Sequence, residues 1–131
     1  MSEKNFSDVG KVAWVDLTVG DATKVKDFYG EVVGWKSEAV QMGDYSDFSM
    51  VPPEAKDAVA GICHARGTNA EIPPVWMIYI LVADLDHSVE RCVALGGQVR
   101  IPPKEMGGSG RYCVIEDPVG AVAALFEPKR D

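Results

Sequence analysis

Two stretches of sequence decide the fold: Ala13-Trp14-Val15-Asp16-Leu17-Thr18-Val19 and, 63 residues later, Trp76-Met77-Ile78-Tyr79-Ile80-Leu81-Val82. In each stretch alternate positions form an apolar face, which predicts a β-strand. Asp21 and Asp84 then stand at the N-cap position of apolar-periodic segments, which predicts helices of about a dozen residues. Gly34 and the pair Gly96-Gly97 supply the helix stops.

The same offset relates the rest of the chain without any insertion, and it predicts three shorter strands after each helix. The six expected strands cover residues 35–42, 45–51, 58–65, 98–101, 111–116 and 121–127. The sequence therefore predicts an α+β fold of two tandem βαβββ modules, at about 11–66 and 75–128. A loop over 67–74 joins them, and together they make one domain over residues 1–131.

Bulk composition excludes several classes of function. The net charge of −7 disfavours nucleic acid and anionic membrane surfaces, because both are bound through basic residues. No apolar run approaches the roughly 20 residues that cross a bilayer, and the polar N-terminus is unlike a signal peptide, so we expect a cytoplasmic protein. The three cysteines Cys63, Cys92 and Cys113 have neither disulfide-framework nor zinc spacing, and we expect them to be reduced.

Three segments, in this order on a 63-residue repeat, resemble the glyoxalase/bleomycin-resistance/dioxygenase superfamily, also called vicinal oxygen chelate proteins. They are Val15–Asp21 followed by Asp27–Trp35, Tyr79–Asp86 followed by Ala94–Gly97, and Gly110–Ala121 ending in Leu125–Pro128. The resemblance implies paired modules with helices outside a curved mixed sheet and a cleft between the modules. It also implies, in metal-dependent members, four ligands from the first and last strands of the modules.

In this chain the four positions that the resemblance assigns to metal ligands hold Trp14, Met77, Gly61 and Ala124. Trp, Gly and Ala cannot ligate, and one Met is a poor ligand for a hard or borderline ion. We therefore expect no metal and no other cofactor. An unconventional site at His64 or Glu127 stays open, although their position along the strands turns both side chains away from the cleft, as an ordinary surface pair. His87 is expected to be a solvated helix residue.

The expected cleft face mixes aromatic and polar side chains, as small-molecule sites do. The candidate ligand contacts are Trp14, Asp16, Met77, Tyr79 and Phe126. Two interpretations stay open for Asp16 and Tyr79: they contact a ligand or act on it, or they hydrogen-bond each other in a filled core. The aromatic residues are likewise either a ligand-binding wall or plain core.

Arg111, beside the Gly-rich stretch 107–110, is a candidate contact for an anionic ligand, or an ion-pair partner of Asp117 or Glu116. The stretch itself is a candidate flap over the cleft. The leading hypothesis is a metal-free protein that binds a small, partly aromatic or apolar organic molecule in the cleft. The alternative is a divalent-metal-dependent lyase, isomerase or dioxygenase of the same superfamily. The resemblance is also compatible with a homodimer.

Overall fold

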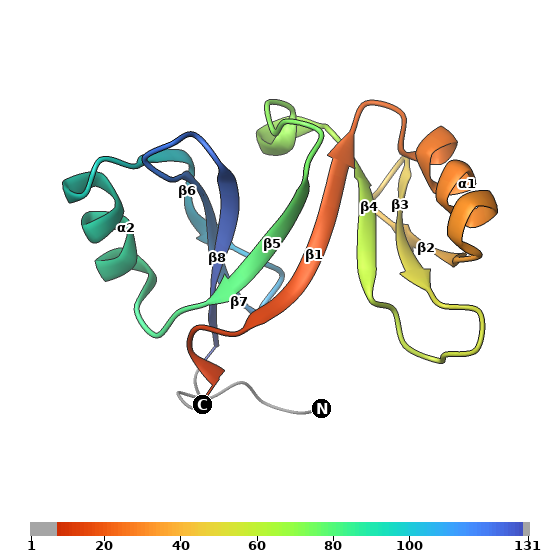
Figure 1. Ribbon diagram of the computed structural model, residues 1–131, viewed down its shortest axis with the longest axis horizontal. Coiled ribbons are helices and arrows are strands. Elements are labelled where there is room, and N and C mark those ends of the chain that lie inside the picture. The colour runs from red at the N-terminus through yellow and green to blue at the C-terminus, as the bar shows by residue number, and fades with distance from the viewer. Residues whose placement is uncertain (1–7, 130–131) are drawn as a thin grey trace. The chain divides into compact units, whose positions relative to one another are not determined.

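The computed structural model describes residues 8–129, and these contain eight strands and two α-helices. Their order along the chain is that of a repeated βαβββ unit (Figure 1). The elements are β1 (Val12–Val19), α1 (Ala22–Val33), β2 (Lys36–Gln41), β3 (Ser46–Val51), β4 (Ala60–His64), β5 (Trp76–Leu81), α2 (Leu85–Ala94), β6 (Gln98–Glu105), β7 (Gly110–Glu116) and β8 (Val122–Pro128). The predicted α+β class and the repeated unit are confirmed.

Two compact units make up the described chain, and each is a module of one helix and one four-stranded sheet. The first module spans residues 14–76, and the second comprises residues 77–129 together with 8–13. The strand order is β2-β3-β4-β1 in the first and β5-β8-β7-β6 in the second. In both, the first strand pairs in parallel with the last, and the remaining neighbours are antiparallel. Grouping the modules into one domain stays a prediction.

The helices begin and end where local chemistry predicts. The Asp21 carboxylate accepts a hydrogen bond from the Lys24 backbone N–H at 3.0 Å, and the Asp84 carboxylate accepts one from His87 N–H at 3.1 Å. Each aspartate thus satisfies a donor that the first helical turn leaves without a partner. At the end of α1, Gly34 adopts a left-handed conformation with φ of 81°, which a residue with a side chain rarely takes.

The apolar cores of the two modules are built from repeat-equivalent positions. Leu17, Ala22, Met50 and Ile62 form a buried cluster in the first module. The second module's cluster contains Leu85, Cys113 and Leu125, with Ile80 packed against it, and each of these lies 63 residues after a member of the first. Each cluster joins a helix to one face of its own sheet. Alternation along the strands therefore places the intervening residues on the opposite face, which we call the helix-free face.

The largest departure from the predicted strand bounds is in β6. The sequence predicted a strand over 98–101, because Pro102 and Pro103 suggested a loop or a strand edge. The structure continues the strand to Glu105, at the edge of the second module's sheet, with register shifts on either side of Ile101. An edge strand tolerates proline because one row of its backbone N–H groups needs no partner in the sheet. The expected loop over 67–74 also contains a short 3₁₀ turn, η2 (Gly67–Asn69).

Candidate functional site

The helix-free face of the first module is polar and is organised around Asp16. Asp16 on β1 lies directly opposite Gly61 on β4, and Thr18 lies opposite Cys63. The Trp14 indole Nε1–H donates a hydrogen bond to the Asp16 carboxylate at 2.5 Å. Two of the predicted ligand contacts, Trp14 and Asp16, are therefore held together by a direct bond.

The absence of a side chain at Gly61 leaves room for this arrangement of Trp14 and Asp16. A Cβ atom added at Gly61 would collide with the Asp16 carboxylate oxygen and would lie 3.5 Å from the Trp14 indole nitrogen. The side chains of Trp14 and Asp16 thus reach across the backbone of β4. They occupy space that any residue larger than glycine would need at position 61.

Cys63, on the same face, is not poised as a nucleophile. Burial raises the pKa of its thiol well above its ordinary value, and the negative charges of Asp16 and Asp47 raise it further. The thiol therefore stays protonated at neutral pH, and the thiolate is the reactive form.

The helix-free face of the second module is apolar and aromatic. Met77, Tyr79 and Val114 are buried, with exposed fractions of 2%, 8% and 0%. Tyr79 lies opposite Ala124 across β5 and β8, and its ring centroid is 6.4 Å from that of Tyr112. Lys104 Nζ lies 6.0 Å from the Tyr112 ring centroid, within range of a cation–π contact.

Phe126 also belongs to this face, because it pairs with Tyr112 across β7 and β8 and is partly buried. The predicted contacts Met77, Tyr79 and Phe126 are thus brought to one face of one sheet.

Arg111 lies on the opposite, helix side of that sheet, and its predicted ion-pair partners were wrong. Its guanidinium Nη2 is 3.1 Å from the Glu127 carboxylate and 3.3 Å from that of Asp86 at the start of α2. These bonds raise the pKa of Arg111, that to Asp86 most and that to Glu127 next. Glu116 could not be the partner, because five residues of extended strand separate it from Arg111 by about 17 Å. Arg111 and Glu127 instead face each other in the β7–β8 register.

The two carboxylates expected to pair with Arg111 have other roles. Glu116 forms an ion pair with Arg100 on the neighbouring strand. Asp117 accepts hydrogen bonds from the backbone N–H groups of Val119 and Ala121, at 2.9 and 3.0 Å, and so stabilises the turn before β8. Neither role is visible in the spacing of the sequence alone.

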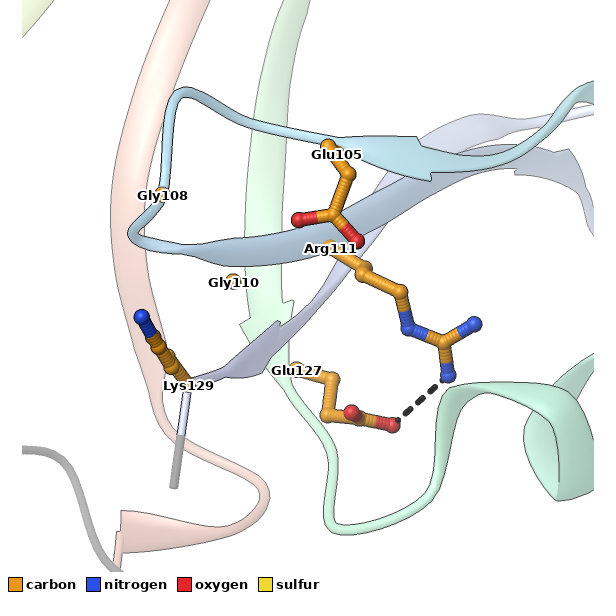
Figure 2. Close-up of a pocket in the computed structure, with 6 residues that line it drawn as sticks. All are labelled: Glu105, Gly108, Gly110, Arg111, Glu127 and Lys129. Atoms are coloured by element: carbon orange, nitrogen blue, oxygen red, sulfur yellow. Dashed lines mark hydrogen bonds and ion pairs between the residues drawn. The ribbon is translucent and has the colours of Figure 1, made fainter. Parts of the chain in front are cut away.

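A shallow pocket of about 440 Å³ lies beside Arg111 in the second module (Figure 2). Its lining residues are Glu105, Gly108, Gly110, Arg111, Glu127 and Lys129. Figure 2 shows the side chains of Arg111 and Glu127 pointing toward one another at one side of this pocket. The pocket carries two acidic and two basic side chains, so its charges are balanced. The sequence singled out Arg111 and Glu127 but missed Glu105 and Lys129, which no motif marks.

His64 and Glu127 lie on the helix sides of their sheets, as their positions along the strands predicted, but neither is a plain surface residue. The Glu127 carboxylate accepts a hydrogen bond from the backbone N–H of Leu85, the first residue of α2, at 2.8 Å. The His64 backbone N–H donates to Asp47 Oδ1 at 2.8 Å, and its Nδ1 lies 3.4 Å from the same oxygen. His87 is exposed, as expected.

The positions that the resemblance assigns to metal ligands do not fit a metal. At Gly61 the space is taken by the Asp16 carboxylate, and Ala124 presents only a methyl group opposite Tyr79. Within residues 8–129, no three His, Cys, Asp or Glu side chains gather closely enough to hold an ion. No helix in the same range is long and apolar enough to cross a membrane.

Comparison with known proteins identifies one family whose model covers most of the chain. The family model described as the Glyoxalase/Bleomycin resistance protein/Dioxygenase superfamily matches residues 11–125. A Mycobacterium tuberculosis protein named "Putative glyoxylase CFP32" is 34% identical over 122 residues, which is 92% of this chain and 47% of that protein. The anthracycline biosynthesis protein DnrV of Streptomyces peucetius is 30% identical over 128 residues, 89% of this chain and 46% of that protein. The chain spans about half the length of these curated relatives.

Solved structures share the fold at low sequence identity. Methylmalonyl-CoA epimerase from Mycobacterium tuberculosis superposes with a TM-score of 0.56 at 19% identity, over 97% of this chain and 93% of that one. The Streptomyces coelicolor methylmalonyl-CoA epimerase gives a TM-score of 0.58 at 12% identity, over 93% and 99%. These likenesses concern the fold alone.

Proposed function

Because the chain belongs to the Glyoxalase/Bleomycin resistance protein/Dioxygenase superfamily, we propose that it binds a small, partly aromatic or apolar organic molecule without the help of a metal ion. The observation that carries this proposal is the helix-free face of the second module, which brings together the buried Met77 and Tyr79 and the partly buried Phe126. Aromatic and apolar side chains with a few polar groups are the usual lining of small-molecule sites.

We assign different roles to the two helix-free faces. Met77, Tyr79 and Phe126 provide apolar and aromatic contacts to the ligand. Asp16 provides the polar contact, and Trp14, whose indole N–H donates to the Asp16 carboxylate at 2.5 Å, provides an aromatic contact beside it. Arg111 lies on the helix side of its sheet, so we propose it only as a contact for an anionic group that enters the pocket beside it.

The proposal is tested by a thermal-shift screen across metabolites and antibiotics, because a ligand that binds the native state raises its stability. The set should include anthracyclines, since one relative is named an anthracycline biosynthesis protein. We expect aromatic hits that shift the melting temperature of the wild-type chain. The Trp14→Ala variant should remain folded and bind these hits more weakly. A variant that loses several kcal/mol of stability while the ligand affinity persists would instead make Trp14 a core residue.

The alternative function, a metal-dependent lyase, isomerase or dioxygenase, is tested separately. Metal analysis of protein purified without a histidine tag should find no stoichiometric divalent ion, because the donor set at Trp14, Met77, Gly61 and Ala124 is unsuitable. A tightly held ion at one per chain would overturn the metal-free proposal. Metal-free turnover that is lost in Asp16→Ala or Tyr79→Phe would instead make the protein an enzyme of a different kind.

A further inference from the structure

We infer that the first module recognises a hydrogen-bond donor on the ligand, a hydroxyl or an amine, through the Asp16 carboxylate that Trp14 and Gly61 hold in place. This inference rests on the proposed function and adds the chemical class of the ligand's polar group. It also assigns a role to Gly61, which positions Asp16 without contacting the ligand.

The position of the carboxylate is fixed by two neighbours, Gly61 and Trp14. Asp16 stands opposite Gly61 in the parallel pairing of β1 and β4. The carboxylate occupies the volume that a Cβ atom at position 61 would fill, and the Trp14 N–H bonds it from two residues away on the same strand. A side chain at position 61 would displace the carboxylate, so the glycine and the aspartate depend on each other.

The chemistry of this group selects its partners. An ionised carboxylate is only an acceptor, with about four lone-pair sites on its two oxygens. The group therefore suits a hydroxyl or an amine and disfavours carbonyl, ether or anionic groups. Asp47 adds a second negative charge on the same face, because it lies two residues before Ser49, which stands opposite Gly61. Of the two kinds of hydrogen-bond donor, the negative charge of these carboxylates favours a protonated amine over a neutral hydroxyl.

The second module lacks this combination of a carboxylate and a facing glycine. The repeat equivalents of Asp16 and Gly61 are Tyr79 and Ala124, which face each other in the same register. Ala124 carries the Cβ that Gly61 lacks, and Tyr79 carries a phenol where Asp16 carries a carboxyl group. The matched positions therefore provide a control within one chain.

The test compares three probes that share one aromatic ring: 2-phenylethylamine, 2-phenylethanol and 2-phenylethyl methyl ether. Their affinities are measured by NMR titration of the wild-type chain and of Asp16→Asn. We expect the amine and the alcohol to bind the wild type about tenfold or more tightly than the ether, since a hydrogen bond to a charged group has that value. Asp16→Asn should remove this preference and leave the affinity for the ether within about twofold.

Gly61→Ala tests the positioning role. It should abolish the preference for donors as Asp16→Asn does, while Ala124→Gly at the matched position leaves the preference intact. Trp14→Phe, which removes the indole N–H and keeps an aromatic ring, should reduce the preference even if Gly61→Ala does not fold.

The outcomes separate the inference from the proposed function. Equal binding of the ether and the amine by the wild type overturns the inference and leaves the proposed function standing. A preference for donors that survives in Asp16→Asn also overturns it. No binding of any of the three probes at millimolar concentration contradicts both the inference and the proposed binding of aromatic ligands.

Discussion

The two modules share one backbone plan and differ in the chemistry of their helix-free faces. On the helix side, equivalent positions hold residues of the same kind, such as Ile62 and Leu125. On the helix-free side, Asp16 in the first module corresponds to Tyr79 in the second. The helix side must fill a close-packed interior, which restricts residue type and volume. On the helix-free side Asp16 is partly buried whereas Tyr79 is buried, and the two copies carry different chemistry there, one polar and one aromatic.

The modules also differ in the register of one strand pair. In the first, Ser49 lies opposite Gly61, whereas in the second the equivalent of Gly61, Ala124, lies opposite Val114. The equivalent of Ser49 is Tyr112, so the register has moved by two residues. A shift of two keeps every side chain on its original face, whereas a shift of one would reverse them all. The repeat therefore tolerates this change without exchanging core and helix-free residues.

The largest effect is expected at position 110, where the modules differ in backbone conformation. Gly110 has φ of 150°, and a Cβ there would collide with the Glu127 carbonyl oxygen. Gly110→Ala should therefore lower the free energy of unfolding by about 3 kcal/mol or more, as measured by urea denaturation. The equivalent residue Asp47 already has a side chain, and Asp47→Ala should cost only about 1–2 kcal/mol, through loss of its hydrogen bond to His64. Equal costs would contradict this difference.

A second test concerns the first strand of each module. Met77 is 2% exposed, and Met77→Ala should cost about 3 kcal/mol by leaving a cavity. Trp14, its repeat equivalent, is only partly buried, so Trp14→Ala should cost less than Met77→Ala. Urea denaturation of the two variants measures both values. The reverse order would show that the first module's helix-free face is core.

A pH dependence distinguishes the two helix-side cores, because position 113 holds a thiol where position 50 holds a methionine. Burial raises the pKa of Cys113 from its ordinary value of 9.0 to about 11. The folded state thus keeps the thiol proton to a higher pH than the unfolded state does. The stabilisation that comes from the protonated thiol is complete below pH 9 and is lost as the pH rises to about 11. The loss is about 2–3 kcal/mol.

Urea denaturation between pH 8 and 11, compared with Cys113→Ala, measures this contribution. The variant should lose less stability across the interval than the wild type, and the dependence that remains includes that of Cys63. An identical pH profile in both proteins would show that Cys113 does not contribute.

The smallest effects are expected at the helix caps. Asp21→Ala should cost about 1 kcal/mol, because α1 loses the side chain that accepts from Lys24 N–H. Asp84→Ala should cost less, because the Glu127 carboxylate also accepts a hydrogen bond at the start of α2. Thermal unfolding of both variants measures the difference. In Glu127→Ala background, the cost of Asp84→Ala should rise toward that of Asp21→Ala.

The ligand contacts stay predictions, but the sequence places the residues that make them correctly on strands. The alternation put Trp14 and Asp16 on one face of β1, and Met77 and Tyr79 on one face of β5, and within each module the structure agrees. From the sequence alone, Gly61 was interpreted only as a position that has lost its metal ligand. Its role in making room for Asp16 was missed, although a glycine within a strand is itself a signal of close approach by another group.

The amino-acid sequence by itself determined the repeat, the ends of the helices and the apolar core of each module. The apolar faces and the helix ends depend on residues close together in the chain, through strand alternation, helical spacing and N-cap bonds, and the repeat is their recurrence after 63 residues. The tertiary structure alone decided which side chains meet across strands, such as Arg111 with Glu127 and Asp16 with Gly61. The physical reason is that the register between two strands is set by packing of the whole sheet and not by either strand alone.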